Sequence, residues 1–144
     1  MRVLVNRRCR SVLDEGALRR ACLKALRSEG AAENSVLSLT ALSEREMADY
    51  NRKYLNRDGP TDVLAFPLGE DDGETRLLGD VLVCPSFVRR HRRRYAVEEG
   101  RELELVAVHG VLHLLGYEDE SEKGAGIMDR RAREILGLRG EEGR

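Results

Sequence analysis

The stretch from Leu105 to Asp119, LVAVHGVLHLLGYED, constrains the fold more than any other part of this sequence. It carries His109 and His113, and on a helix this four-residue spacing places both imidazoles on one face, about one turn apart. The flanking residues are apolar almost all the way round, which is typical of a helix buried inside a protein. The sequence therefore predicts a buried central helix over 101–115 that presents two metal-ligating side chains.

The residues after His113 extend this pattern to a third candidate ligand. Gly116 suits a helix end because glycine readily adopts the left-handed conformation, and Asp119 follows six residues after His113. The spacing H-x-x-x-H-x-x-G-x-x-D matches the metzincin zinc pattern, with a carboxylate, which zinc accepts, as third ligand. The predicted metal site is thus His109, His113 and Asp119 around one Zn²⁺. The alternatives are that the histidines are core residues and that Asp119 belongs to a solvated loop or helix cap.

Position 110 departs from the zinc-protease pattern, which has its glutamate general base there. This chain has Gly110 instead, so the predicted nucleophile is a metal-bound water, which can lose a proton near neutral pH without a dedicated base. No side chain is assigned as a catalytic residue. Two histidines and a carboxylate also suit iron, nickel or manganese, so the identity of the metal stays open.

The rest of the chain alternates between strand and helix patterns. Strands are expected at 2–6, 35–41, 61–66 and 81–84, a polar loop at 69–75, and helices at 13–28, 43–55, 85–97, 101–115 and 121–136. Ser43, with Glu46 three residues later, is a capping-box start. His91 falls on the apolar stripe of its helix and is interpreted as a packing residue, not a ligand. The prediction is one α+β domain over 1–144, a small mixed β-sheet packed with about five helices, with a frayed tail after Gly140.

Composition and charge favour a cytoplasmic protein without a membrane span. No apolar window reaches span length, the run 3–5 is too short for a signal peptide, and the three cysteines are too dispersed for a disulfide framework or a cysteine zinc site. The net charge is −1, but residues 1–30 carry eight basic against three acidic residues, and 89–94 reads RRHRRR. Such segregation can steer an anionic partner such as RNA, or it can reflect solvated helix faces.

Four segments resemble the YbeY family of bacterial endoribonucleases: HGVLHLLGYED (109–119), TDVLAFP (61–67), LGDVLV (78–83) and NRKYL (51–55). The resemblance implies a single zincin-like domain with one Zn²⁺, cleavage of single-stranded RNA, and a role in ribosomal RNA maturation and ribosome quality control. Ribosomal RNA and ribosomal proteins are the expected partners. The family motif H-G-x-L-H-L-x-G-Y-D-H has a third histidine where this chain has Asp119. Many members also carry an arginine at the position of Leu55.

Hydrolysis of RNA needs cations that hold phosphate, and the arginine fork binds phosphate bidentately. The candidates are Arg52, Arg57, Arg76 and the cluster Arg89–Arg94. Two other functions stay open: a zinc protease, and a non-catalytic RNA-binding ribosome assembly factor with a structural metal. The fourth coordination position distinguishes them from a nuclease, since water there indicates catalysis and a protein ligand indicates a structural site.

Overall fold

The computed structural model describes residues 1–138, so the tail predicted to fray after Gly140 lies outside the described residues. The elements in chain order are β1 (Arg2–Arg8), α1 (Glu15–Ser28), β2 (Ser35–Leu42), α2 (Glu44–Leu55), β3 (Val63–Asp71), β4 (Arg76–Val83), α3 (Pro85–Arg90), a 3-10 turn (Arg92–Tyr95), α4 (Glu102–Leu114) and α5 (Glu122–Leu136). This is the predicted α+β composition with five α-helices within 1–138. That the whole chain forms one domain stays a prediction.

The four strands form a mixed sheet in the order β1-β2-β4-β3. β1, β2 and β4 run parallel, and β3 pairs antiparallel with β4 at the edge. β1 and β2 are joined through α1, and the chain reaches β4 from β2 through α2 and β3, so each parallel pair is joined by a long connection that contains a helix. β3 and β4 are joined by a hairpin. The mixed sheet of the prediction is therefore confirmed.

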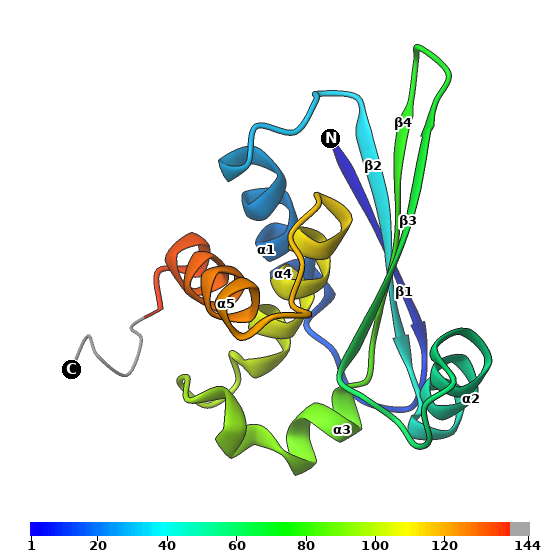
Figure 1. Ribbon diagram of the computed structural model, residues 1–144, viewed down its shortest axis with the longest axis vertical. Helices are drawn as coiled ribbons and strands as arrows, with labels where there is room; N and C mark the ends of the chain where they lie inside the picture. Colours follow the sequence, from blue (N-terminus) through cyan, green and yellow to red (C-terminus); the bar gives the residue numbers. More distant parts are fainter. Residues whose placement is uncertain (139–144) are drawn as a thin grey trace.

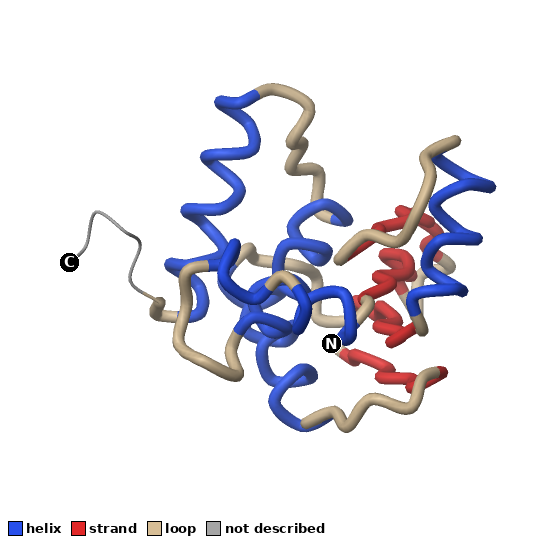
Figure 2. The backbone as a smooth tube through the Cα atoms, turned by 90° about the horizontal axis from the view of Figure 1, so that it is seen from below, coloured by secondary structure: helices blue, strands red, loops and turns tan. Residues whose placement is uncertain are grey.

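The helices cover the two faces of the sheet unequally. Figure 1 shows α1, α4 and α5 on one side of the sheet and α2 on the other, and Figure 2 shows the strands between α2 and the remaining helices. α4 lies centrally, in contact with β3, β4, α1 and α5. Its buried residues run from Leu105 to Leu112, which confirms the buried central helix.

Three of the described α-helices begin at a residue whose side chain caps them. Ser43 caps α2, its side chain accepting a hydrogen bond from the Glu46 amide at 3.2 Å, as the capping-box pattern predicts. Asp14 caps α1 and Ser121 caps α5 in the same way. No helix within 1–138 is both long enough and apolar enough to cross a membrane.

The polar segment 69–75 was expected to be a loop, and the structure corrects this. β3 extends to Asp71, so this arm of the hairpin continues into the polar segment, and only 72–75 form the turn before β4 begins at Arg76. The turn is closed by the Asp72 carboxylate, which accepts hydrogen bonds from the amides of Glu74 and Thr75 at 2.9 and 2.7 Å. The arms project past the core (Figure 1), where both faces meet water and no apolar alternation marks a strand.

The helix expected over 85–97 is also corrected. α3 ends at Arg90, and a 3-10 turn and a left-handed Ala96 (φ 52°) follow. The Arg133 side chain donates to the carbonyl oxygens of Tyr95 at 2.6 Å and Ala96 at 3.3 Å. A distant residue on α5 thus holds the chain where it leaves the 3-10 turn, short of the predicted end at 97.

Candidate metal centre

α4 holds the two histidines side by side at the edge of the core. The ring centroids of His109 and His113 are 5.6 Å apart, and both side chains are partly buried. The residues between them are buried against the sheet and the neighbouring helices. The rings therefore share the one face of α4 that opens towards a cleft, as their spacing predicts.

The end of α4 returns the chain towards these histidines. Gly116 has a φ of +106°, its amide bonds to the His113 carbonyl at 3.1 Å, and the Tyr117 amide bonds to the Leu112 carbonyl at 3.0 Å. This pair of bonds is a Schellman motif, which reverses the chain directly after a helix. Asp119 consequently approaches His113, with Oδ2 at 3.2 Å from Nε2.

The geometry and charge of the three side chains fit one metal ion. One ligand atom from each of His109, His113 and Asp119 lies within 4.8 Å of the other two. Ligand atoms about 2.0–2.1 Å from a tetrahedral Zn²⁺ are separated by about 3.3 Å, so the group needs only a small contraction. Burial, followed by the neighbouring His113, lowers the pKa of His109 below its usual value. The neutral imidazole thus favoured is the form that binds metal.

The loop that carries Asp119 is braced on its N-terminal side. The Tyr117 hydroxyl donates to Glu29 Oε1 at 2.7 Å, and Arg131 Nε donates to Glu29 Oε2 at 2.7 Å. Burial raises the pKa of Glu29, but the hydrogen bonds from Tyr117 and Arg131 outweigh it and leave the pKa below its usual value. The charged Glu29 therefore ties the loop to both α1 and α5.

Position 110 faces the sheet rather than the cleft. A Cβ atom there would lie 2.4 Å from Val81 Cγ1 and 3.0 Å from Val63 Cγ2. Glycine is thus the residue that lets α4 approach β3 and β4 this closely. A glutamate general base does not fit at this position, which explains the departure from the protease pattern.

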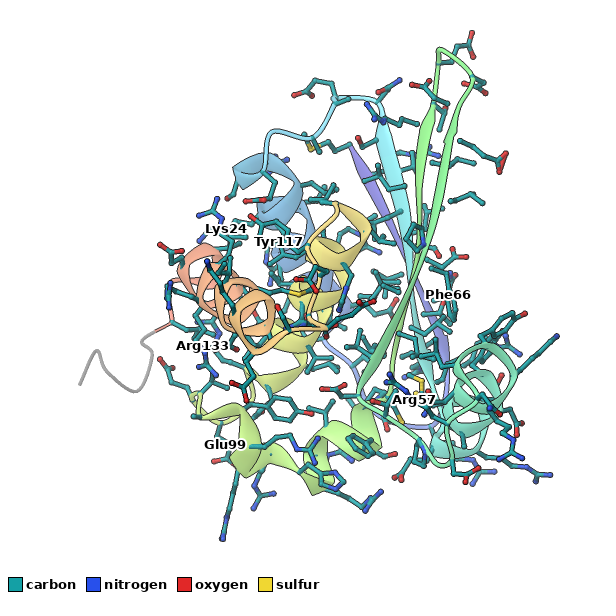
Figure 3. The ribbon with its side chains drawn as sticks, in the orientation of Figure 1. Lys24, Arg57, Phe66, Glu99, Tyr117 and Arg133 are labelled. Carbon is teal, nitrogen blue, oxygen red and sulfur yellow. The ribbon has the colours of Figure 1, made fainter. Side chains whose placement is uncertain are left out.

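The three candidate ligands line an open cleft of about 650 Å³ between β3 and the helices α4 and α5. Arg57 lies on the β3 side and Arg133 on the α5 side, as Figure 3 shows. Arg94, from the 3-10 turn, also lines the cleft, together with Asp62 and Asp129. The cleft therefore places guanidinium groups and carboxylates around the histidine pair.

The structure separates the arginines that the sequence suggested for phosphate. Arg57 and Arg94 line the cleft, whereas Arg52 pairs with Asp58 and Arg76 lies in the hairpin, outside the cleft. Leu55, at the position where the resembled family carries arginine, lines the same cleft as Arg57, two residues later. The Phe87 carbonyl lies 2.9 Å from His91 Nδ1, and this histidine lies outside the metal-ligating group.

Sequence reasoning missed Arg133, Asp62 and Asp129. Arg133 Nε donates to Asp129 Oδ2 at 2.9 Å, and its other two nitrogens hold the backbone of Tyr95 and Ala96. The only sequence signal for this pair is its i, i+4 spacing on α5, which many surface helices share. Asp62, which accepts from the Tyr95 hydroxyl at 3.1 Å, carries no local signal because that partner is 33 residues away.

Comparisons with known proteins agree with these features. The family described as Endoribonuclease YbeY matches residues 7–139. Two proteins named Endoribonuclease YbeY, from Pelotomaculum thermopropionicum and Moorella thermoacetica, are 39% and 38% identical over 127 and 128 residues. These alignments cover 85% and 83% of this chain and 84% and 82% of the relatives. The solution structure of TM1509 from Thermotoga maritima superposes with a TM-score of 0.60 at 27% identity, covering 94% of this chain and 89% of that one. This chain therefore belongs to the Endoribonuclease YbeY family.

Proposed function

We propose that this chain is a metal-dependent endoribonuclease that cuts single-stranded RNA in the cytoplasm, with ribosomal RNA as its substrate in ribosome maturation and quality control. The observation that carries the proposal is the convergence of His109, His113 and Asp119 in an open cleft that also contains arginines. The names of the relatives, Endoribonuclease YbeY, support the nuclease class.

In this proposal the chain supplies a preformed set of three ligands. The pKa of His109 is lowered, which favours its neutral form, and α4 holds His113 one turn away. The Schellman turn and the Tyr117–Glu29 hydrogen bond hold the loop of Asp119 beside them. A bound Zn²⁺ would act as a Lewis acid towards a phosphoryl oxygen and would lower the pKa of a water at its fourth position.

Arg57 and Arg94 are the phosphate-binding groups of the proposal. Both line the cleft, and neither forms an ion pair with another residue in 1–138. Arg133 has a different part, because its guanidinium is already engaged by Asp129 and two carbonyl groups. It fixes the turn that precedes α4 and so orients Arg94. Many members of the family have an arginine at the position of Leu55, and in this chain Arg57 takes over the phosphate-binding role of that arginine.

Different residues count against the two rival functions, a zinc protease and an assembly factor with a structural metal. A protease requires a glutamate at Gly110, where Val81 leaves no space for a side chain. A structural zinc site closes its fourth position with a protein ligand. Among the residues that the structure describes, the metal-ligating group has three members, and Asp119 is 45% exposed. The open position favours a nuclease over an assembly factor with a structural metal.

The test is cleavage of a single-stranded ribosomal RNA fragment by the zinc-loaded protein. His113→Ala and Asp119→Ala should abolish cleavage while leaving the far-ultraviolet circular dichroism spectrum unchanged. Asp49→Ala is the matched control, because Asp49 is an exposed aspartate on α2 outside the cleft, and it should cut like the native chain. Equal cleavage by all four proteins would refute the proposal. RNA binding without cleavage by any of them would favour the assembly factor.

A further inference from the structure

A strongly basic surface lies beside the metal cleft and has no part in holding the metal. Residues 89–94 alone line a shallow hollow of about 680 Å³, and five of the six are arginines, all exposed. Arg94 lines both this hollow and the metal cleft, so the two are adjoining. Figure 1 shows α3 and the turn after it at one end of the molecule, below α4.

Four of the five guanidinium groups are available to a ligand. Arg90 is engaged by Glu44, to which its Nε donates at 3.2 Å and its Nη2 also donates. Arg89, Arg92, Arg93 and Arg94 form no ion pair with another residue in 1–138. These four are called the arginine surface below. Arg89 and Arg92 also line a neighbouring hollow that contains Asp14, Glu99, Glu102 and Glu104. Four positive charges within six residues still repel one another, and a bound polyanion would relieve that repulsion.

The backbone beneath the arginine surface is fixed from both sides. On one side, Glu44 of α2 accepts from Ser86 at 2.8 Å as well as from Arg90. On the other, the buried Tyr95 donates to Asp62, and Arg133 holds the Tyr95 carbonyl. The charges therefore project from a rigid turn, which reduces the entropy lost when a ligand orders them.

The chemistry of this surface suits a phosphate backbone and not exposed bases. Guanidinium forks bind phosphate oxygens bidentately. The ring of Tyr95 is buried. The ring of Phe87 is stacked with His91 at a centroid distance of 4.1 Å, and the guanidinium carbons of Arg90 and Arg94 lie 5.7 and 5.5 Å from its centroid. Its face is thus already used within the protein. Recognition here depends on backbone charge without stacking of bases.

We infer that the arginine surface binds the sugar-phosphate backbone of a single-stranded RNA next to the segment held in the metal cleft, with Arg94 joining the two sites. The inference rests on the proposed function for the identity of the strand in the cleft. It adds a second binding region, outside the metal centre, which extends the contact with RNA by several phosphates.

The test measures the salt dependence of binding to a fluorescein-labelled single-stranded RNA of 20 nucleotides, by fluorescence anisotropy. All proteins carry His113→Ala, so that binding is separated from cleavage. Arg92→Ser with Arg93→Ser removes two positive charges from the arginine surface and leaves Arg94 in place. Arg20→Ser with Arg27→Ser is the matched control, because both residues are exposed on α1 and the change in net charge is the same.

The logarithm of the association constant falls linearly with the logarithm of the salt concentration, and loss of two phosphate contacts should make this slope shallower by about 1.4. If affinity at 1 M salt is unchanged, this slope corresponds to binding about 25-fold weaker at 0.1 M salt. The control should keep the parental slope, and Arg92→Lys with Arg93→Lys should restore most of the affinity, because lysine retains the charge. Parallel slopes for the two serine pairs would overturn the inference. Equal affinity for a poly-glutamate of matched charge would overturn it too, because the surface would then accept any polyanion.

The outcomes separate the inference from the proposed function. If the native chain cuts RNA but the two serine pairs have parallel slopes, the nuclease stands and the arginine surface does not bind RNA. If the native chain fails to cut but the slope falls as expected, the surface binds RNA and the nuclease proposal fails.

Discussion

Replacing Gly110 with alanine tests how α4 is held against the sheet that supports the candidate metal centre. An added Cβ atom would lie 2.4 Å from Val81 Cγ1, a distance that forces atoms to move. Val81 is fully buried on β4, and Val63 Cγ2 lies only 3.0 Å from the same Cβ position. The clashing atoms are methyl groups of buried valines on paired strands, so we expect α4 to shift away from the sheet and to move His109 with it.

Two opposing effects set the size of the change. An added methyl group in a well-packed core costs about 1–3 kcal/mol. Alanine in place of glycine within a helix contributes about 1 kcal/mol in the other direction. Gly126, in the interior of α5, isolates the second effect, because no atom lies within 4 Å of the Cβ it would acquire. The difference between Gly110→Ala and Gly126→Ala is thus the steric cost alone, about 2–3 kcal/mol at this contact distance.

Urea unfolding of both variants measures that difference directly. Gly110→Ala should lower the free energy of unfolding by about 1–2 kcal/mol, and Gly126→Ala should raise it by about 1 kcal/mol. In thermal unfolding, 1 kcal/mol corresponds to about 3 °C for a chain of this length. Adding Val81→Ala to each variant should cost less in the Gly110→Ala background, because the removed methyl groups make room. Equal stabilisation by the two alanines would refute the packing account of Gly110.

Further predictions concern the metal, its third ligand and the loop that positions it. Zinc at a hundred times its Kd should raise the free energy of unfolding by about 2.7 kcal/mol, and His113→Ala should remove most of that gain in a thermal shift assay. Asp119→His should move the pH–activity midpoint downwards, because loss of the carboxylate raises the charge of the zinc-loaded site from +1 to +2; identical profiles would contradict this. Tyr117→Phe should weaken zinc binding about tenfold or more by releasing the loop of Asp119, which calorimetry would measure. The pKa of Glu29 in the folded protein lies below its ordinary value of 4.5, so the charged side chain stabilises the fold at pH values above 4.5. This contribution is lost as the pH falls through the pKa of the folded state. Glu29→Gln should therefore unfold with less pH dependence below about pH 4.5, and curves parallel to those of the native chain would exclude this role.

Local signals in the sequence predicted the elements that local interactions determine. The apolar surround of α4 predicted its burial, the Ser43–Glu46 spacing predicted the start of α2, and Gly116 predicted the turn after α4. In each case the relevant partners lie within six residues. The approach of Asp119 to His113 follows from the same turn.

Features that depend on distant partners were not predicted. The chain turns away from a helical path after Tyr95, where Arg133, about 40 residues later, holds the carbonyl groups of Tyr95 and Ala96. The hairpin arms of β3 and β4 are longer than their polar sequence suggests, because strand pairing alone is sufficient where both faces meet water. The sequence could not rank the candidate arginines either, since only the fold places Arg57 and Arg94 in the cleft and leaves Arg76 in the hairpin.

The packing at Gly110 also bears on the chemistry of the site. Because β3 and β4 occupy the space where a protease keeps its glutamate, any proton transfer in the proposed reaction would use groups that enter from the cleft. Besides Asp119, the carboxylates that line the cleft are Asp58, Asp62, Glu120 and Asp129. Asp62 and Asp129 are hydrogen-bonded, to Tyr95 and to Arg133. Those bonds orient the carboxylates but also connect them to the turn that carries Arg94. A substrate bound to Arg94 would therefore act on the same hydrogen-bond network that borders His109. We expect Arg133→Gln to change both phosphate binding and proton transfer. Arg57→Gln should change phosphate binding alone. The measurements are the KM for RNA and the pH dependence of kcat in each variant. If Arg133→Gln changes only one of these quantities, or if Arg57→Gln changes both, phosphate binding and proton transfer are not coupled through Arg133.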